Sequence, residues 1–199
     1  MSETNIDDMD LITLVKSVRA CSICADLPLG PNPILQISET AKILIVGQAP
    51  GRITHNKNVP FDDPSGVRLR QWMGITKDIF YDDQKIAILP MGFCFPGSGK
   101  GGDLPPRSEC AKTWRDAILS KIPNCEMTLI MGQHAINWHI KDNRKVSLTQ
   151  RVSEWKTNFP TQIILPHPSP RNNRWLKRNS WFETDVIPAL QTEIAKLLA

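Results

Sequence analysis

A short apolar run that ends in a glycine turn is the feature that most limits how this chain can fold. Ile43 to Val46 are four aliphatic residues in a row, and Gly47-Gln-Ala-Pro-Gly51 follows them directly. A continuous apolar run of this length is typical of a strand buried on both faces of a parallel sheet. The two glycines lack a Cβ, so the backbone between them can approach a ligand closely, although an ordinary strand-to-helix turn would also use them. Ligands of open α/β sheets bind at the carboxyl ends of the strands, which makes this loop the first candidate for a site.

A second run of the same kind lies near the end of the chain. Ile163 to Leu165 is followed by Pro-His-Pro-Ser-Pro-Arg-Asn, which places His167 between two prolines. Proline fixes φ, so this histidine sits on a rigid loop. Two parallel strands that each end in a rigid loop can bring the loops to one crevice. We therefore expect Gly47–Gly51 and His167–Asn172 to face each other.

Short apolar runs alternate with helix-like segments along the whole chain. We expect strands at Lys42–Val46, Ile86–Met91, Met127–Met131 and Gln162–Leu165. We expect helices at Asp8–Ala25, Gly66–Met73, Ser108–Ile122 with Ser108 as N-cap, Gln133–Ile140 and Trp181–Leu198, a long loop at Gly92–Pro106, and no clear structure at 147–155. The alternation predicts an α/β fold, a three-layer α/β/α sandwich with a four-stranded parallel central sheet. No linker interrupts the pattern, so residues 1–199 are interpreted as a single domain.

Composition and charge point to a soluble globular protein. The chain is 41% hydrophobic and 22% charged, and it carries a net charge of +4, which is ordinary for that class. No apolar run approaches the ~20 residues that span a bilayer, and the acidic start at Met1 is not a secretory signal. We therefore expect a cytoplasmic monomer with no membrane contact. Four basic residues cluster after the histidine loop, Arg171, Arg174, Lys177 and Arg178; they suit a phosphate-backbone partner, but a solvated helix face looks the same.

The two loops together resemble a known family. G-Q-A-P-G at Gly47–Gly51 with the downstream Pro60-Phe61, and H-P-S-P-R-N at His167–Asn172, are similar to the two motifs of the uracil-DNA glycosylase superfamily. The resemblance spans about Arg19 to Leu190 and is closest to the iron–sulfur-bearing, family 4-type branch, although the second motif also resembles that of the single-strand-selective branch. It implies a uracil-DNA glycosylase-like domain that flips uracil or another deaminated base out of DNA. Such an enzyme cleaves the N-glycosidic bond in base-excision repair.

The resemblance assigns roles around the base. Phe61 would stack on the flipped base, and Gly47 and Gln48 would bind it. His167 would donate a hydrogen bond to a base carbonyl as negative charge develops there. Ser169, Arg171 and Asn172 would contact the DNA. Arg171 and Asn172 would bind phosphates or fill the gap that the flipped base leaves, although a solvated loop is an equally good interpretation of these two.

Several residues are candidates for activating or orienting the attacking water. Gln48 stands where the family 4-type enzymes carry glutamate, and Thr54 and His55 stand where they carry an acidic pair. The amide of Gln48, or the backbone N–H groups of its loop, could bind a base carbonyl and orient water, but Gln48 cannot act as a base. His55 is the nearest substitute for orienting or deprotonating water. Asp62 and Asp63 are the alternative, because their charge would favour an oxocarbenium-like sugar.

The end of the second strand departs from the family. The family places an asparagine there to bind the base edge, whereas this chain has Pro90 or Leu89 at the matching place. Neither side chain forms hydrogen bonds. The sequence therefore predicts weaker discrimination, with uracil as the main substrate and hypoxanthine or another deaminated base also accepted.

Five cysteines in a chain expected in the cytoplasm are unlikely partners for disulfides. Cys21, Cys24, Cys94 and Cys110 follow a C-x2-C … C-x15-C pattern that resembles the cluster ligands of the family 4-type branch. Four thiolates can hold a [4Fe–4S] cluster or a tetrahedral zinc, and the resemblance favours the cluster. Cys125 matches no ligand and is interpreted as a core residue.

Two other functions remain open. A non-catalytic iron–sulfur nucleic-acid-binding protein of the same fold would explain the missing acidic pair and the missing asparagine. A relative that acts on a free nucleoside or a small glycoside would suit the modest net charge.

Overall fold

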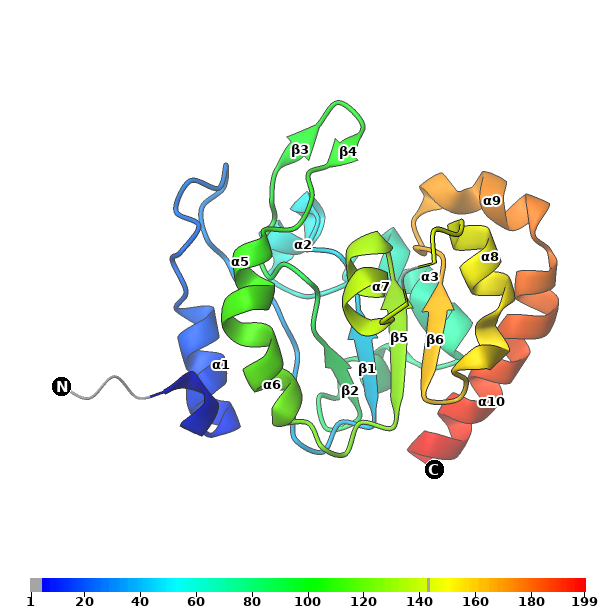
Figure 1. The fold of residues 1–199 in the computed structure, drawn as a ribbon, viewed down its shortest axis with the longest axis horizontal. Helices are drawn as coiled ribbons and strands as arrows, with labels where there is room; N and C mark the ends of the chain where they lie inside the picture. Colours follow the sequence, from blue (N-terminus) through cyan, green and yellow to red (C-terminus); the bar gives the residue numbers. More distant parts are fainter. Residues whose placement is uncertain (1–4, 143) are drawn as a thin grey trace.

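A four-stranded parallel sheet forms the centre of the computed structural model, which describes residues 5–142 and 144–199. Residues 1–4 of the acidic start, on which the argument against a signal peptide depended, lie outside the described residues. The strand order is β2-β1-β5-β6, and all three pairings are parallel (Figure 1). The strands are β1 (Ile43–Val46), β2 (Ile86–Ile88), β5 (Met127–Met131) and β6 (Gln162–Leu165). The predicted four-stranded parallel sheet is confirmed.

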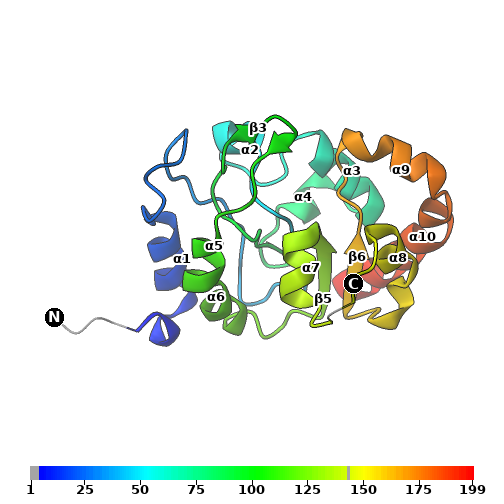
Figure 2. The same cartoon turned by 45° about the horizontal axis from the view of Figure 1, so that its top comes forward.

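Helices cover both faces of this sheet. In Figures 1 and 2, α6 and α7 lie on one face, while α3 and α10 lie together on the other. This arrangement confirms the predicted three-layer sandwich. The α-helices are α1 (Leu11–Arg19), α2 (Arg52–Lys57), α3 (Pro64–Met73), α4 (Lys77–Phe80), α5 (Ser108–Cys110), α6 (Asp116–Ser120), α7 (Gln133–His139), α8 (Leu148–Ser153), α9 (Asn173–Arg178) and α10 (Ile187–Leu198). The other helical turns are η1 (Ile6–Asp8), η2 (Ala111–Arg115), η3 (Trp155–Thr157), η4 (Pro170–Asn172) and η5 (Phe182–Val186).

The N-terminal helix is shorter than the sequence predicts. Helix α1 begins after Asp10, whose carboxylate accepts the N–H of Thr13 at 2.7 Å, and it ends at Arg19. The prediction of a helix through Ala25 was therefore wrong. Cys21 and Cys24 lie on turns after the helix instead, where the N–H of Leu27 bonds the carbonyl of Cys24. Turns can aim two nearby thiols at one point, which a continuous helix does less readily.

Two other segments also differ from prediction. Gly92–Pro106, predicted as a loop, contains a small hairpin of β3 (Ser98–Gly99) and β4 (Gly102–Asp103). The prediction of Ser108 as N-cap was wrong, because Arg107 precedes α5 without a side-chain cap. The helix that follows runs through a π-helical turn at η2. None of the described helices is long and apolar enough to cross a membrane.

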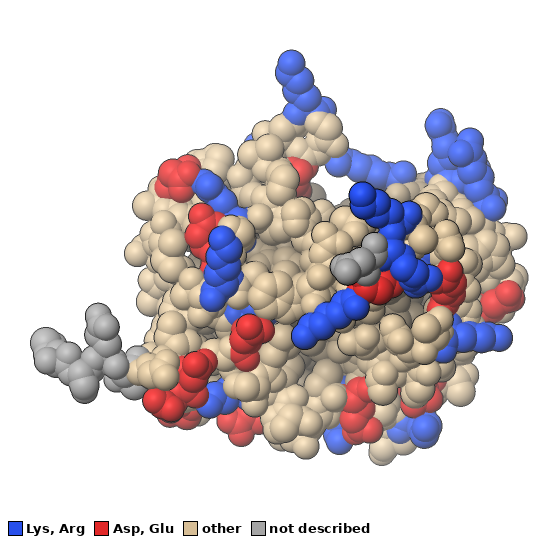
Figure 3. Space-filling model, in the orientation of Figure 1, with Lys and Arg blue, Asp and Glu red and all other residues tan. Residues whose placement is uncertain are grey.

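The carboxyl ends of the strands share one end of the molecule. The hairpin β3–β4 and helix α9 stand beyond that end (Figure 1). Lysine and arginine side chains gather over these two elements in Figure 3, while acidic side chains are common at the opposite end. The loops predicted to form the site therefore open onto a basic rim.

A backbone contact beside the site depends on Gly66. Phe61 has a φ of 55°, which L side chains rarely adopt. A Cβ on Gly66 would overlap the carbonyl oxygen of Phe61, so glycine is required at the first turn of α3 for the two backbones to meet.

We expect Gly66→Ala to lower the free energy of unfolding by about 2 kcal/mol or more, since neither backbone can move without strain. Gly101→Ala is the control, because a Cβ there meets nothing within 4 Å, and we expect a change within about 0.5 kcal/mol. Urea unfolding followed by circular dichroism measures both. Equal midpoints for the two variants would contradict the steric argument.

Candidate active site

A pocket at the carboxyl end of β1 brings the two sequence motifs together. Gly47, Gln48, Phe61 and His167 all line it, as the sequence predicts for base-binding residues. Three further residues that the sequence analysis considered also line it, namely Thr54, Asp63 and Pro90. Ile34, which no motif pointed to, lies there too.

His167 is held with one ring nitrogen already occupied. Its Nδ1 accepts the backbone N–H of Ser169 at 3.2 Å. Burial lowers the pKa of His167, and the charge of Asp63 opposes this shift. A neutral ring whose Nδ1 accepts a hydrogen bond carries its proton on Nε2. His167 can therefore act as a neutral donor into the pocket.

The loop that carries His167 is tied to helix α3. Arg68 donates from Nη1 to the carbonyls of Pro168 (3.3 Å) and Ser169 (3.2 Å). Its Nη2 donates to the side chain of Asn173 at 2.8 Å. Arg68 and its acceptors are about a hundred positions apart in sequence, so no local pattern could have identified this residue.

Phe61 is fixed in the pocket from several sides. Its ring lies against Gly47, where an added Cβ would stand 3.6 Å from Cζ. Its edge-on neighbour is Phe80, at 6.2 Å between ring centroids. Tyr81 donates its hydroxyl to the carbonyl of Pro60 at 3.0 Å. Strained backbone that the surroundings enforce is common at functional sites, so the positive φ of Phe61 supports a role in the pocket.

The loop after β1 is bonded to the chain that follows β2. Met91 donates its N–H to the carbonyl of Gly47 at 2.9 Å, and Gly92 donates to that of Gln48 at 2.8 Å. The N–H of Gln48 has no acceptor in the part of the chain that the structure describes. The strand predicted at Ile86–Met91 ends at Ile88. Leu89 and Pro90 are both buried, and Pro90 is the one that lines the pocket.

The polar residues proposed to handle water separate into two groups. Thr54 lines the pocket and is 4% exposed, whereas His55 does not line it. The ring centroid of His55 lies 6.2 Å from that of Phe95. The buried Nδ1 of His55 has no hydrogen-bond partner among the described residues. His55 therefore lies outside the pocket lining, and its role with water stays a prediction.

The adjacent aspartates also differ in their placement. Asp62 forms ion pairs with Lys57 at 3.0 Å and Lys77 at 3.7 Å. Asp63 lines the pocket, and its Oδ1 accepts the N–H of Gly66 at 2.8 Å. Asp63 is thus the carboxylate beside His167.

The three predicted DNA-contact residues follow His167 but differ in their surroundings. Ser169 accepts the N–H of Arg171 through Oγ at 3.3 Å. Asn172 donates its amide to the carbonyl of His167 at 2.7 Å, so it shapes the loop. The exposed guanidinium of Arg171 lies against Gly102 of the hairpin. The hairpin also reaches the first motif, since Asp103 stands 3.4 Å from the place of a Cβ on Gly51.

Four cysteines line a second, smaller cavity. They are the predicted set of Cys21, Cys24, Cys94 and Cys110. Backbone N–H groups point at two of the sulfurs, from Asn32 to Cys94 Sγ at 3.3 Å and from Phe93 to Cys110 Sγ at 3.4 Å. Burial raises the pKa of the Cys110 thiol to about 11. No group of three or more His, Cys, Asp or Glu side chains within residues 5–142 and 144–199 is arranged to hold a single metal ion.

Cys125 lies apart from this cavity. Its thiol is half-buried and faces the carbonyl of Met127 at 3.4 Å.

Comparison with a family model agrees with the two motifs. The family model of the uracil DNA glycosylase superfamily matches residues 35–191. A candidate uracil DNA glycosylase from Methanosarcina acetivorans, solved by solution NMR, aligns with a TM-score of 0.45 and 15% identity, over 82% of this chain and 94% of that one.

Proposed function

Because the chain belongs to the uracil DNA glycosylase superfamily, we propose that it excises uracil, and with lower preference other deaminated bases, from DNA. One observation carries the proposal. Phe61, Gln48 and His167 line one pocket, Nδ1 of His167 accepts a hydrogen bond, and the N–H of Gln48 has no acceptor among the described residues. These are the groups needed to stack a flipped base and to bind its carbonyls.

The base would leave as an anion. The bond between the sugar C1′ and the base nitrogen breaks, and its electron pair goes to the base. The Nε2–H of His167 and the N–H of Gln48 would donate to base carbonyls, and these bonds strengthen as charge develops. Both donors are held in place before the reaction, so the site needs little reorganisation. Phe61 would stack on the ring and keep it in the pocket.

The sugar would be stabilised by Asp63. Its Oδ1 is held by Gly66, and its Oδ2 makes no hydrogen bond within the described residues. A carboxylate at this position would favour the positive charge on the sugar. The water that adds to C1′ would pass its proton to this group. Thr54 is the neighbouring hydroxyl that can orient the water.

The DNA strand would run across the basic rim. Arg171 and the helix α9 cluster of Arg174, Lys177 and Arg178 are exposed there, and none of them forms an ion pair with another described residue. Free cations on one face suit a phosphate backbone. We place the protein in the cytoplasm, where thiols such as these stay reduced.

We also propose that the four cysteines hold a [4Fe–4S] cluster, which would place the chain in the family 4-type branch. The support is their shared cavity and the two N–H···S contacts, since hydrogen bonds to sulfur are a normal part of such sites. When bound, the cluster would supply structure: it would tie the turns after α1 to the segment that carries the hairpin. The residues that act on the base are separate from it.

A non-catalytic DNA-binding protein is the main alternative. Single- and double-stranded oligonucleotides that contain uracil, incubated with the protein and then treated with alkali, separate the two functions. Strand breaks at uracil support excision. Binding without breaks supports the alternative, and neither binding nor breaks favours action on a free nucleoside.

His167→Ala should slow single-turnover excision by about 10²–10³-fold, because it removes one preorganised donor. Binding to the same DNA should change much less. His134→Ala is the control, since that histidine is exposed on α7. Equal rates in the two variants would remove His167 from the mechanism.

The excision rate of the wild type should also stay constant as the pH falls through 6.5, the ordinary pKa of histidine. The folded pKa of His167 lies below it, so the neutral donor persists there. A rate that rises on acidification would show that the protonated ring is the active form.

Cys94→Ser should abolish the brown colour of protein purified without oxygen and lower its free energy of unfolding, because metal binding contributes directly to folding. Cys125→Ser should keep both, since Cys125 lies outside the cavity. Elemental analysis measures the amounts of iron, sulfide and zinc that each variant binds. Zinc without iron would keep the four ligands and contradict the cluster.

Pro90→Asn should sharpen the preference for uracil over hypoxanthine by about 10-fold, because it supplies a hydrogen-bonding group for the base edge. Pro90→Ala removes the ring without adding the amide and serves as the control. Single-turnover rates on matched oligonucleotides give the ratio. A wild type that removes uracil alone would show that another group already forms hydrogen bonds with the edge of the base.

A further inference from the structure

Arg115 is a fully buried cation that bonds to Pro90, one of the residues that line the pocket. It is 0% exposed and ends the π-helical turn η2. Its Nη1 donates to the carbonyls of Leu89 (3.3 Å) and Pro90 (2.9 Å), and its Nη2 lies 2.9 Å from Nε2 of His139. Its Nε has no partner among the described residues. π-Helical turns are frequent at functional sites.

The charge of Arg115 is not neutralised by a carboxylate. It forms no ion pair with any described residue, and Asp116, the next residue, acts on it without such contact. Its other neighbour is uncharged at neutral pH, since burial and then the charge of Arg115 lower the pKa of His139 to about 4. The pKa of Arg115 itself falls to about 10 through burial, so it remains protonated at neutral pH.

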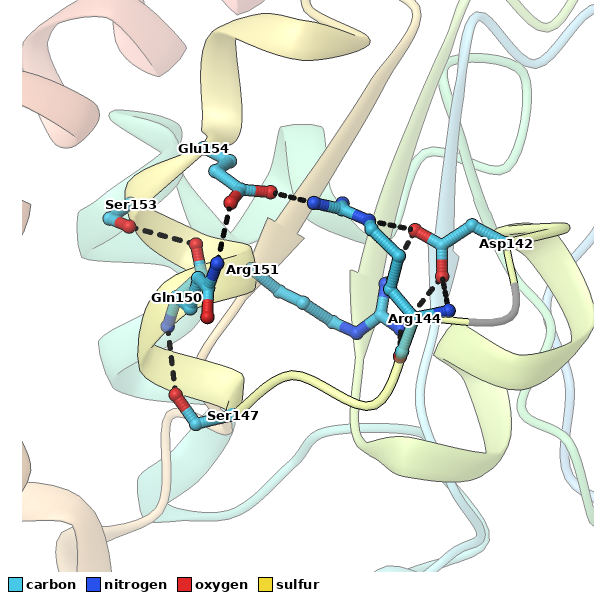
Figure 4. Close-up of polar contacts among 7 residues, drawn as sticks. All are labelled: Asp142, Arg144, Ser147, Gln150, Arg151, Ser153 and Glu154. Carbon is cyan, nitrogen blue, oxygen red and sulfur yellow. Dashed lines mark hydrogen bonds and ion pairs between the residues drawn. The ribbon is translucent and has the colours of Figure 1, made fainter.

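A second buried arginine shows the usual arrangement. Arg151 is 7% exposed and donates to both carboxylate oxygens of Asp142, at 3.0 and 2.8 Å, as Figure 4 shows. A buried charge without such a partner costs several kcal/mol of desolvation. Burying Arg115 therefore lowers the stability of the fold, which a role in packing alone does not explain.

A chain of hydrogen bonds connects Arg115 with residues that line the pocket. The carbonyl of Pro90 belongs to the same peptide unit as the N–H of Met91, which donates to the carbonyl of Gly47 at 2.9 Å. That carbonyl shares a peptide with the free N–H of Gln48. A trans peptide directs its C=O and N–H to opposite sides, so the N–H of Gln48 points away from Met91. Gly47, Gln48 and Pro90 all line the pocket.

Each hydrogen bond accepted by a peptide carbonyl makes its N–H a stronger donor, and a chain of such bonds is cooperative. We propose that Arg115 is a positioning residue of the glycosylase site, which polarises the N–H of Gln48 through two peptide units and so strengthens its bond to the departing anionic base. The inference deepens the proposed function and rests on it.

The test compares two leaving bases. 5-Fluorouracil is a weaker base than uracil as an anion, so its departure needs less stabilisation from the enzyme. Arg115→Met should slow single-turnover excision of uracil by about 10-fold, and that of 5-fluorouracil by only about 2-fold. Binding to DNA that carries a non-cleavable 2′-fluoro-deoxyuridine should be unchanged, because the ground-state carbonyl is neutral.

Arg151→Met is the matched control, since it also removes a buried guanidinium but lies outside the pocket lining. The Arg151 variant should excise both bases at the wild-type rate, or should slow the excision of both by the same factor. If Arg115→Met does not fold, Arg115→Leu against Arg151→Leu gives the same comparison, because leucine also removes every donor to the carbonyl of Pro90.

The outcomes separate the two proposals. A larger loss on uracil than on 5-fluorouracil in the Arg115 variant supports the inference. Equal losses on both bases would overturn it and leave the proposed function intact. A wild type that excises neither base would overturn the proposed function and the inference with it.

Discussion

The loop after β1 depends on two backbone hydrogen bonds, from Met91 to Gly47 and from Gly92 to Gln48. They extend the pairing of β1 with β2 beyond the end of the regular strands. Pro90 donates no bond there, because proline has no N–H. It lines the pocket directly before the two residues that are bonded to the loop. The position of the first motif, the place of Pro90 in the pocket lining and the free N–H of Gln48 all follow from this contact.

Long-range arginine contacts fix the remaining parts of the site. Arg68 ties the His167 loop to α3 through two carbonyls, and Arg115 ties the end of β2 to η2 through two more. A guanidinium has five donors in a planar fork, so one side chain can satisfy several loop carbonyls at once. Loops at the ends of parallel strands have few backbone partners of their own, and these two side chains replace them.

The pocket and the cysteine cavity meet in one segment of the chain. The stretch from Pro90 to Cys110 contributes Pro90 to the pocket, Cys94 and Cys110 to the cavity, and a hairpin between them. A group bound by the four cysteines would therefore fix the hairpin relative to both motif loops. This connection explains how a structural site at a distance can matter for DNA contact without entering the chemistry.

The sequence by itself determined the sheet, the family motifs and the set of four cysteines, because apolar runs, glycine and proline turns and cysteine spacing are local. It placed Gly47, Gln48, Phe61 and His167 in one pocket. Only the tertiary structure chose Thr54 over His55, Asp63 over Asp62 and Pro90 over Leu89. Adjacent residues carry the same local signal, and the direction of each side chain depends on packing against distant segments. For the same reason Arg115 resembles any helix arginine in sequence, and its burial and its bond to Pro90 appear only in the fold.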